Sequence, residues 1–416
     1  MRFQSSAKKL CRISEKTRIL PGETAVPGVL GNVCRDRQGA FASAPTFIRN
    51  NAKESAVYMN SRVSPPSVRV GSELEIRHSM RELVRQAVLE GLGNRSFMVD
   101  TDADLMGLIG AAGLANGLSQ PERQAMSEFG QGFGLPWLVL RGLPLQEQLP
   151  KTPQGYGDDT QTLFSDTMLL GGMFLAGLKP IAYSYENFSR VMRNVAPSKL
   201  EVDSVSSHGS KRDLHWHTDN AYAFEDGYRS PRSTGSYLLP VGSPSPRFLC
   251  FVGLRLNDGQ GQAVPTELLP VDAILADMPK RLQNLLLGPI YEIRPGVSNT
   301  RASMKRMPLL EMCPRTGAYL LRFNANEGQT LGLTTLATGA VTELSKRLED
   351  MDARSIPIYL RPGELLLFDN YRVLHRRKSF DPGSWDEARW LRRCFGTTDP
   401  SGGQFVDRLH RPYVWQ

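Results

Sequence analysis

Cysteine, histidine and long apolar runs are all scarce in this chain of 416 residues. The five cysteines are scattered and form no C-x-x-C pair, which argues against a disulfide framework or a structural zinc site and predicts a reducing, cytoplasmic location. The best apolar runs, such as "MLLGGMFLAGL" at 168–178, are far shorter than the roughly 20 residues that a membrane-spanning helix needs. The sequence therefore predicts no membrane partner.

Most of the chain also lacks an excess of charge of either sign. Residues 1–70 hold twelve Lys/Arg and four Asp/Glu, so they carry the whole formal net charge of +8 and the remaining 346 residues are balanced. A neutral body argues against nucleic acid as a partner. The first 70 residues show no hydrophobic period, so we expect a disordered basic extension over 1–70 and a single folded domain over 71–416.

The pattern of apolar residues in the domain changes at about residue 205. Before residue 205, helices are expected over the segment that starts at Ser72, where Ser72 and Glu75 read as a capping box, and over about 102–116 and 161–178. A buried strand is expected over 135–145. After residue 205, two helices are expected, over 271–287 and 334–351. Short apolar runs between turn residues predict strands over 247–256, 317–323, 356–360, 363–368 and 389–395.

Many short strands with little βαβ alternation favour a sandwich or a barrel. The fold class expected is mainly β with flanking helices (α+β). Additional segments, which we interpret as insertions, occupy about 225–242 and 271–310.

Two of only six histidines lie two apart in "DLHWHTDNA", residues 213–221. In an extended strand, side chains two apart share a face, so His215, His217 and Asp219 would point the same way. A divalent metal would suit that arrangement, and so would a network of hydrogen bonds. The stretch alone leaves both alternatives open.

A second polar group follows a buried strand in "GELLLFDNYRVLHRRKSF", which carries His375. Further on, a strand over 389–395 would place Arg389, Leu391 and Arg393 on one face and Arg392 on the other. Buried guanidinium groups need anionic partners, and no acidic residue alternates with them on this strand. A ligand that carries a carboxylate would supply the missing charge.

These pieces, in this order, resemble the Fe(II)/2-oxoglutarate dioxygenases of the taurine dioxygenase superfamily, particularly the clavaminate synthase-like branch. The resemblance rests on "SSHGSKRDLHWHTDNAY", on "SPSPRFLCFVGLRLNDGQGQAVPTELLP", and on "GELLLFDNYRVLHRR" with "RWLRRCF". Upstream, "WLVLRGLPLQEQLPKTP" is similar to the N-terminal strand of that branch. Together the matches cover roughly 135–400, and the distal histidine motif with its arginine strand is the most specific part.

The resemblance implies a double-stranded β-helix (jelly-roll, cupin-like) core and an iron site. His217, Asp219 and His375 match the facial triad of two histidines and one carboxylate that holds Fe(II) and leaves three positions open. His215 shares the expected face, but the match makes it a supporting residue rather than a ligand. Arg376 stands where the family pattern has glycine.

The resemblance also implies a co-substrate site. Arg389 matches the residue that binds the distal carboxylate of 2-oxoglutarate, and Thr266 matches the hydroxyl beside it. Arg393 matches a second arginine that binds either 2-oxoglutarate or the substrate. Together with Asn220, it lies where an amino-acid carboxylate or amide would be held.

The implied activity uses O2 and 2-oxoglutarate to hydroxylate, desaturate or cyclise an unactivated carbon of a small amino acid or a derived metabolite, with release of succinate and CO2. The carboxylate of Asp219 favours these outcomes over halogenation, because halogenating relatives lack it. Two alternatives stay open: an oxygenase for another small molecule or a macromolecule, and a barrel that binds metal or ligand without turnover. The oligomeric state is also open.

Overall fold

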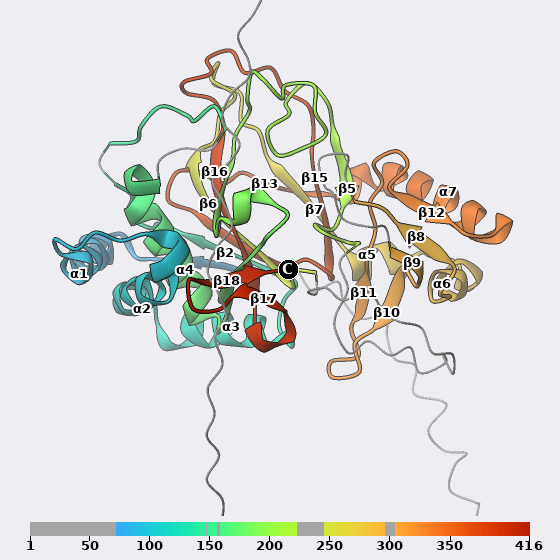
Figure 1. Ribbon diagram of the computed structural model, residues 1–416, viewed down its shortest axis with the longest axis horizontal. Helices are drawn as coiled ribbons and strands as arrows, with labels where there is room; N and C mark the ends of the chain where they lie inside the picture. The colour runs from blue at the N-terminus through green and yellow to red at the C-terminus, as the bar shows by residue number, and fades with distance from the viewer. Residues whose placement is uncertain (1–71, 147, 156–158, 223–244, 296–303) are drawn as a thin grey trace, which may run out of the picture. The chain divides into compact units, whose positions relative to one another are not determined.

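The computed structural model describes residues 72–146, 148–155, 159–222, 245–295 and 304–416 (Figure 1). The expected extension over 1–70 and the segment expected as an insertion over about 225–242 lie outside these residues. The described chain combines helices with one large sheet and three smaller ones. A mixture of strands and flanking helices is therefore confirmed.

The large sheet has nine strands and is antiparallel along most of its length. Its order is β1-β2-β14-β6-β16-β3-β18-β17, and β4 also pairs with β16. The strands are β1 (Ser72–Glu75), β2 (Trp137–Arg141), β3 (Lys179–Tyr183), β4 (Met192–Val195), β6 (Phe248–Arg255), β14 (Leu365–Asp369), β16 (Trp390–Thr397), β17 (Phe405–Asp407) and β18 (Arg411–Trp415).

A four-stranded sheet has the order β13-β7-β15-β5. Its strands are β5 (Leu214–His217), β7 (Thr266–Pro270), β13 (Ile356–Ile358) and β15 (Val373–Arg377). The order β12-β8-β9 and the pair β10-β11 form the two smallest sheets. Their strands are β8 (Tyr291–Ile293), β9 (Met304–Met307), β10 (Leu310–Met312), β11 (Tyr319–Leu321) and β12 (Thr330–Gly332).

Seven α-helices and five short 3-10 helices complete the described chain. The α-helices are α1 (Arg81–Leu92), α2 (Val99–Gly117), α3 (Gln120–Gln131), α4 (Leu163–Leu175), α5 (Val271–Ala276), α6 (Lys280–Leu286) and α7 (Thr335–Asp350). The 3-10 helices are η1 (His78–Met80), η2 (Asp159–Thr162), η3 (Asn187–Ser189), η4 (Asp352–Arg354) and η5 (Pro400–Gly402).

Side chains along β14 alternate between two hydrophobic cores, as the period of two in a strand requires. Leu365 and Leu367 pack in a core shared with α1–α4, whereas Leu366 and Phe368 pack in a core shared with the four-stranded sheet. A third core joins that sheet to α5–α7. The layers are thus α1–α4, the nine-stranded sheet, the four-stranded sheet and α5–α7, and Figure 1 shows the two helical groups on opposite sides.

Helices α2 and α4 pack with their backbones in contact. A Cβ atom added at Gly110 would lie 2.1 Å from the carbonyl oxygen of Thr167, and one added at Gly171 would lie 2.4 Å from the carbonyl carbon of Gly110. The apolar run at 168–178 is therefore mostly a buried helix followed by a turn. None of the helices that the structure describes has both the length and the hydropathy to cross a bilayer.

One predicted helix start is wrong. Ser72–Glu75 is strand β1, which pairs in parallel with β2, and the first α-helix begins only at Arg81. A capping box does occur at the start of α3, between Ser119 and Glu122. The short polar-apolar alternation of "SELE" fits a strand as well as a helix, and pairing with a distant strand decides between them.

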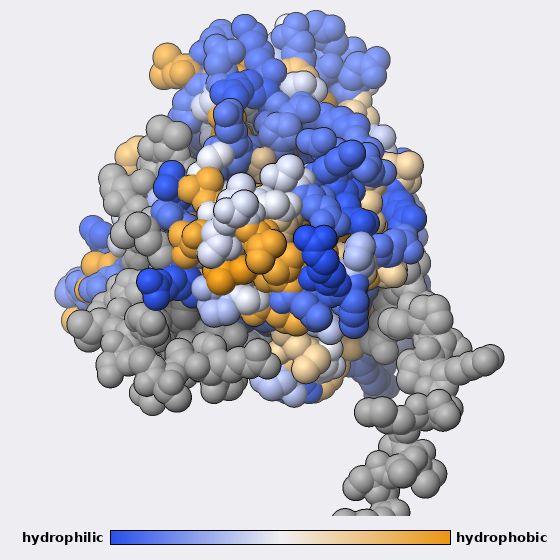
Figure 2. Space-filling view, turned by 90° about the vertical axis from the view of Figure 1, so that its right-hand side faces the viewer, coloured by the Kyte–Doolittle hydropathy of each residue, from blue (hydrophilic) through white to orange (hydrophobic). Residues whose placement is uncertain are grey.

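The exposed face over α6 and α7 carries a small apolar group within a mostly polar surface. Figure 2 shows hydrophobic side chains gathered near the middle of this view, with hydrophilic residues around them. The larger exposed apolar residues here include Leu287, which follows α6 directly, and Leu336 of α7. Single exposed apolar side chains are common on soluble proteins, and this group lies away from the site described next.

Candidate functional site

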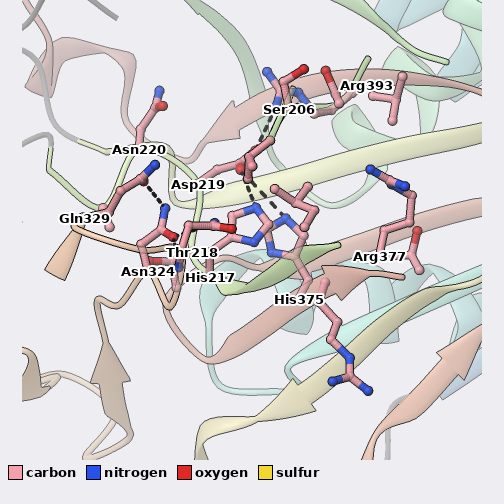
Figure 3. Close-up of a pocket in the computed structure, with 18 of the residues that line it drawn as sticks. Ser206, His217, Thr218, Asp219, Asn220, Asn324, Gln329, His375, Arg377 and Arg393 are labelled. Atoms are coloured by element: carbon pink, nitrogen blue, oxygen red, sulfur yellow. Dashed lines mark hydrogen bonds and ion pairs between the residues drawn. The ribbon is translucent and has the colours of Figure 1, made fainter. Parts of the chain in front are cut away.

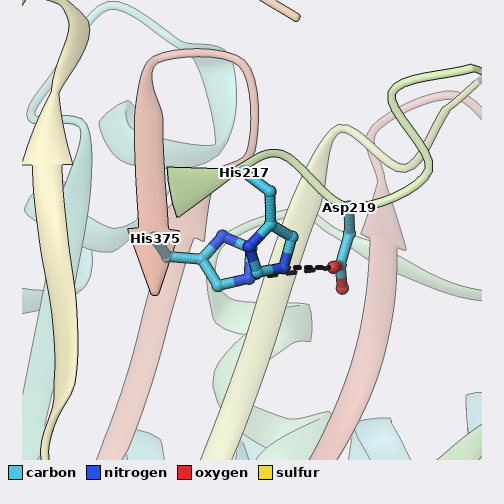
Figure 4. A group of neighbouring side chains, drawn as sticks. All are labelled: His217, Asp219 and His375. Carbon is cyan, nitrogen blue, oxygen red and sulfur yellow. Dashed lines mark ion pairs between the residues drawn. The ribbon is translucent and has the colours of Figure 1, made fainter. Parts of the chain in front are cut away.

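Three predicted residues meet between the two larger sheets. His217 ends β5 and is paired in register with His375 of β15, while Asp219 lies in the turn after β5. Asp219 Oδ1 lies 3.2 Å from His217 Nε2 and 3.7 Å from His375 Nε2 (Figure 4). One potential ligand atom from each residue lies within 4.8 Å of the other two.

Neighbouring groups fix the orientation of this cluster. His217 Nδ1 lies 2.7 Å from the carbonyl oxygen of His215, so it donates its proton there and leaves the lone pair of Nε2 for a ligand. Buried Asn370 accepts a hydrogen bond from the Asp219 backbone N–H and donates one to the Asp219 carbonyl, both at 2.9 Å. Asn370 thus holds the turn that presents the carboxylate.

The electrostatics of the cluster favour a neutral His375 and an ionised acid. Burial, reinforced by the positive charge of Arg393, lowers the pKa of His375 to about 3. Burial alone would raise the pKa of Asp219, but Arg393 and the two imidazoles hold it well below its usual value. Two imidazole nitrogens and one carboxylate oxygen form a donor set that fits a divalent transition metal such as Fe(II).

Arg389 and Thr266 meet across the two sheets, as the resemblance implied. The Arg389 guanidinium donates to the Val264 carbonyl at 3.0 Å and to Thr266 Oγ1 at 2.8 Å. No carboxylate of the described residues pairs with it. Burial, and the positive charge of Arg377, lower the pKa of Arg389 to about 9. This buried cation can therefore receive a ligand carboxylate.

Arg393 differs from Arg389, because the protein supplies its anionic partners. It donates to Asp219 Oδ2 at 2.8 Å (Figure 3). It also donates to Glu186 Oε1 at 2.6 Å. The expectation that only a ligand could supply anionic partners is therefore wrong for Arg393. Its partners come from elsewhere in the chain, whereas the sequence argument considered only its own strand. Glu186 also accepts from Asn220 Nδ2 at 2.9 Å and from Arg193.

Two other arginines near the site are buried. Arg392 forms a salt bridge with Asp166, which agrees with the interpretation that this side chain is either solvated or salt-bridged. The same interpretation is wrong for Arg377, which donates to the backbone carbonyls of Gly209 and Lys378. Burial lowers the pKa of Arg377 to about 10.

Arg376 and His215 lie beside the cluster without joining it. Arg376 pairs with Glu267 at 2.6 Å and lies over the ring of Trp216, with Cζ 4.3 Å from the ring centroid. An arginine therefore fits at the position where the family pattern has glycine. The His215 side chain is exposed and is not part of the metal-ligand group, although its carbonyl orients His217.

A cavity of about 180 Å³ adjoins the cluster. His217, Asp219, His375, Arg389, Thr266 and Arg393 all line it. Sequence reasoning missed Glu186, Asn370 and a group of side-chain amides at 324–329. None of them belongs to a pattern of spacing, and only proximity in the fold connects them to the site.

Comparison with known proteins agrees with this geometry. Residues 270–395, which include His375, Arg389 and Arg393, match the family described as taurine catabolism dioxygenase TauD, TfdA family. L-lysine 3-hydroxylase of Catenulispora acidiphila is 24% identical over 271 residues, which cover 64% of this chain and 68% of that protein. L-asparagine oxygenase of Streptomyces coelicolor is 25% identical over 265 residues, which cover 63% of this chain and 71% of that protein.

A shorter match, to clavaminate synthase 2 of Streptomyces clavuligerus, is 41% identical over 64 residues and covers 15% of this chain and only 18% of that protein. Among solved structures, asparagine oxygenase with Fe(II), 2S,3S-3-hydroxyasparagine and succinate has a TM-score of 0.65 at 22% identity, covering 82% of this chain and 98% of that one. The non-heme iron oxygenase OrfP with Fe and alpha-ketoglutaric acid has a TM-score of 0.65 at 18% identity, covering 83% and 100%. At these identities the solved structures share the fold, and the similarity to the TauD, TfdA family extends over residues 270–395.

Proposed function

We propose that this protein is a non-haem Fe(II)/2-oxoglutarate-dependent oxygenase that hydroxylates a small amino acid or an amino-acid-derived metabolite. The observation that carries the proposal is the cluster of His217, Asp219 and His375, with the unpaired guanidinium of Arg389 lining the same cavity. Relatives named as L-lysine 3-hydroxylase and L-asparagine oxygenase support a free amino acid as substrate.

Each residue has a role in this proposal. His217, Asp219 and His375 hold Fe(II), while Arg389 and Thr266 bind the distal carboxylate of 2-oxoglutarate. When bound, the iron supplies the oxidative decarboxylation of 2-oxoglutarate by O2, which yields succinate and CO2 and transfers one oxygen atom to a C–H bond. Desaturation or ring closure would use the same residues.

Arg393 and Glu186 are assigned to the substrate. The pair offers both charges that a zwitterionic amino acid needs, a guanidinium for its carboxylate and a carboxylate for its ammonium group. Asn220 orients Glu186 through its side-chain amide. Because Arg393 also binds Asp219 Oδ2, it orients the proposed metal ligand as well.

The finer fold assignment belongs to the same proposal. We assign the facing nine-stranded and four-stranded sheets to a double-stranded β-helix, or jelly roll, within the single domain expected over 71–416. Their shared core and the fold of the solved relatives support this assignment. The cytoplasmic location expected from the cysteines stays a prediction.

An anaerobic titration with Fe(II) and 2-oxoglutarate tests the proposal. The wild-type protein should develop the weak visible charge-transfer band of an Fe(II)–2-oxoglutarate complex and, with O2 and a suitable amino acid, release succinate. His375→Ala should abolish both signals. His78→Ala, at an exposed histidine of η1, is the matched control and should retain both. A wild-type protein that binds Fe(II) but never releases succinate would instead support a barrel without turnover.

A further inference from the structure

Three side-chain amides line one wall of the cavity. Asn324, Asn326 and Gln329 lie in the segment between β11 and β12, and all three line the cavity beside the histidine cluster. Asn324 is also bridged to His217 of β5, so the amide wall is tied directly to the strand that carries a proposed iron ligand. Figure 3 shows Asn324 joined to Gln329.

A backbone group fixes the direction of this chain of amides. The N–H of Asn326 donates to Asn324 Oδ1 at 2.9 Å, and a backbone N–H cannot accept, so the acceptor must be the oxygen of Asn324. Asn324 Nδ2 is then the donor to Gln329 Oε1, at 2.6 Å. The nitrogen of Gln329 is therefore the free end, and its two N–H groups have no partner among the described residues.

The rest of the wall holds this end in place. The backbone N–H of His215 donates to Asn326 Oδ1 at 3.4 Å, and the backbone N–H of Asn324 donates to Thr330 Oγ1 at 3.0 Å. The Gln329 backbone carbonyl accepts from the backbone N–H of Arg294, whose guanidinium pairs with Glu292 at 2.9 Å. The wall thus presents the N–H donors of Gln329 toward the substrate.

The described walls of the cavity offer no further carboxylate for a second substrate cation. The carboxylates that line the cavity there are Glu186, assigned above to the ammonium group of the amino acid, and Asp219, assigned to the metal, and arginines pair with both. An ammonium or guanidinium group at the end of the substrate side chain would find no other carboxylate among the described cavity residues, and burying an unpaired charge is costly.

From these contacts we infer that the substrate is an amino acid whose side chain ends in a carbonyl oxygen, as a carboxamide, a ureido group or a carboxylate, and that Gln329 Nε2 binds this oxygen. The inference rests on the proposed function, since it names the substrate class of the same site. It assigns Gln329 as a specificity-determining residue and excludes lysine-like and arginine-like side chains.

Matched pairs of free amino acids test this. L-citrulline and L-arginine have nearly the same shape and differ in a ureido oxygen against a guanidinium, and L-glutamine and L-ornithine make a shorter pair. Two signals are measured: the shift of the anaerobic Fe(II)–2-oxoglutarate band on adding the amino acid, and the initial rate of hydroxylated product formation, with its matching succinate, at varied concentrations of the amino acid. The carbonyl member of at least one pair should have at least about a tenfold higher kcat/KM. L-glutamate then separates carboxylate from carboxamide preference.

The variant Gln329→Glu sharpens the test. One carboxylate oxygen still accepts from Asn324, while an oxygen replaces the free nitrogen, so the preference within each pair should fall or reverse toward the cation. Gln161→Glu, at an exposed glutamine of η2, makes the same charge change outside the cavity lining and should leave the ratio unchanged.

A failure of this inference can be told apart from a failure of the proposed function. Equal or better use of the cationic member by the wild-type protein, or no band shift with any of the four amino acids, overturns this inference while the Fe(II)–2-oxoglutarate band still supports the proposed function. An unchanged ratio in Gln329→Glu overturns the role of Gln329. Absence of the band itself overturns the proposed function and this inference with it.

Discussion

Arg389 and Arg392, three residues apart at β16, are both almost fully buried, at 4% and 1% exposure, yet their surroundings differ. Arg392 faces the helices and forms two hydrogen bonds with Asp166 of α4, at 2.8 and 2.7 Å. Arg389 faces the cavity, and its partners among the described residues are neutral, the Val264 carbonyl and the Thr266 hydroxyl. The protein neutralises one buried cation itself and leaves the other for a ligand.

This difference separates stability from binding on one strand. A buried charge that has lost its partner strongly destabilises the fold, so Asp166 and Arg392 should act together in folding. A buried charge that lacks an anionic partner from the start reduces stability in the absence of ligand, and the loss is recovered when an anion binds. Substitutions on the helix side of β16 should therefore lower the free energy of unfolding, whereas substitutions on the cavity side should weaken ligand binding without lowering it.

The largest effect is expected for Asp166→Ala. It leaves Arg392 buried without its carboxylate and should lower the free energy of unfolding by about 3–5 kcal/mol, measured by urea denaturation. Asp104→Ala breaks a surface pair with Lys179, in which the side chains are 52% and 44% exposed, and should lower it by no more than about 1 kcal/mol. Equal losses of unfolding free energy in the two variants would show that the buried Asp166–Arg392 pair is no more important for stability than a surface pair.

Arg389→Gln should weaken co-substrate binding without lowering the stability of the ligand-free protein. It removes a charge-assisted contact worth about 1.5–3 kcal/mol, so the KM for 2-oxoglutarate should rise roughly 10- to 100-fold while the free energy of unfolding of the ligand-free protein is not reduced. Arg347→Gln, on α7, makes the same substitution away from the cavity and should leave the KM unchanged. A stability loss as large as that of Asp166→Ala would mean that Arg389 is a structural residue.

The pH dependence of 2-oxoglutarate binding tests the same charge. With a pKa of about 9, Arg389 loses its proton as the pH rises through 9, so the dissociation constant should increase by up to about tenfold per pH unit above 9. The sign for stability is the reverse. The unfolded state binds more protons than the folded state between pH 9 and 12.5, so this group makes the ligand-free fold more stable as the pH rises there. In an anaerobic titration, Arg389→Gln should lack the inflection near pH 9.

Strand periodicity and motif spacing predicted much of this site. Alternation along 389–393 placed Arg389 and Arg393 on the cavity side and Arg392 on the other, and the cavity lining agrees. The same period in β5 gave His217 correctly, but it failed for Asp219, which lies in the turn beyond the strand and is held there by Asn370. Local pattern thus predicts which side of a strand a residue faces.

What lies opposite a residue depends on distant parts of the chain. Glu186 is more than 200 residues from Arg393, and Asp166 lies 226 residues before Arg392. No spacing rule links such pairs, so the sequence could not show that Arg393 has carboxylate partners while Arg389 has none among the described residues. The direction of the amide chain that ends at Gln329 depends on one backbone hydrogen bond, which only the folded structure reveals.

The smallest effect is expected for Thr266→Val. The hydroxyl accepts from Arg389 at 2.8 Å and is proposed to contact the 2-oxoglutarate carboxylate, and the substitution removes it while keeping the shape of the side chain. Because Arg389 still neutralises the carboxylate, losing this one hydroxyl contact should cost only about 0.5–1.5 kcal/mol, so the KM for 2-oxoglutarate should rise roughly 3- to 10-fold with little change in kcat. Thr167→Val is the control, because that hydroxyl donates only to the Leu163 carbonyl within α4 and is not part of the cavity wall. If both variants lose stability but neither changes the KM, Thr266 contributes to the fold and not to co-substrate binding. Arg389 would then bind the 2-oxoglutarate carboxylate without the hydroxyl.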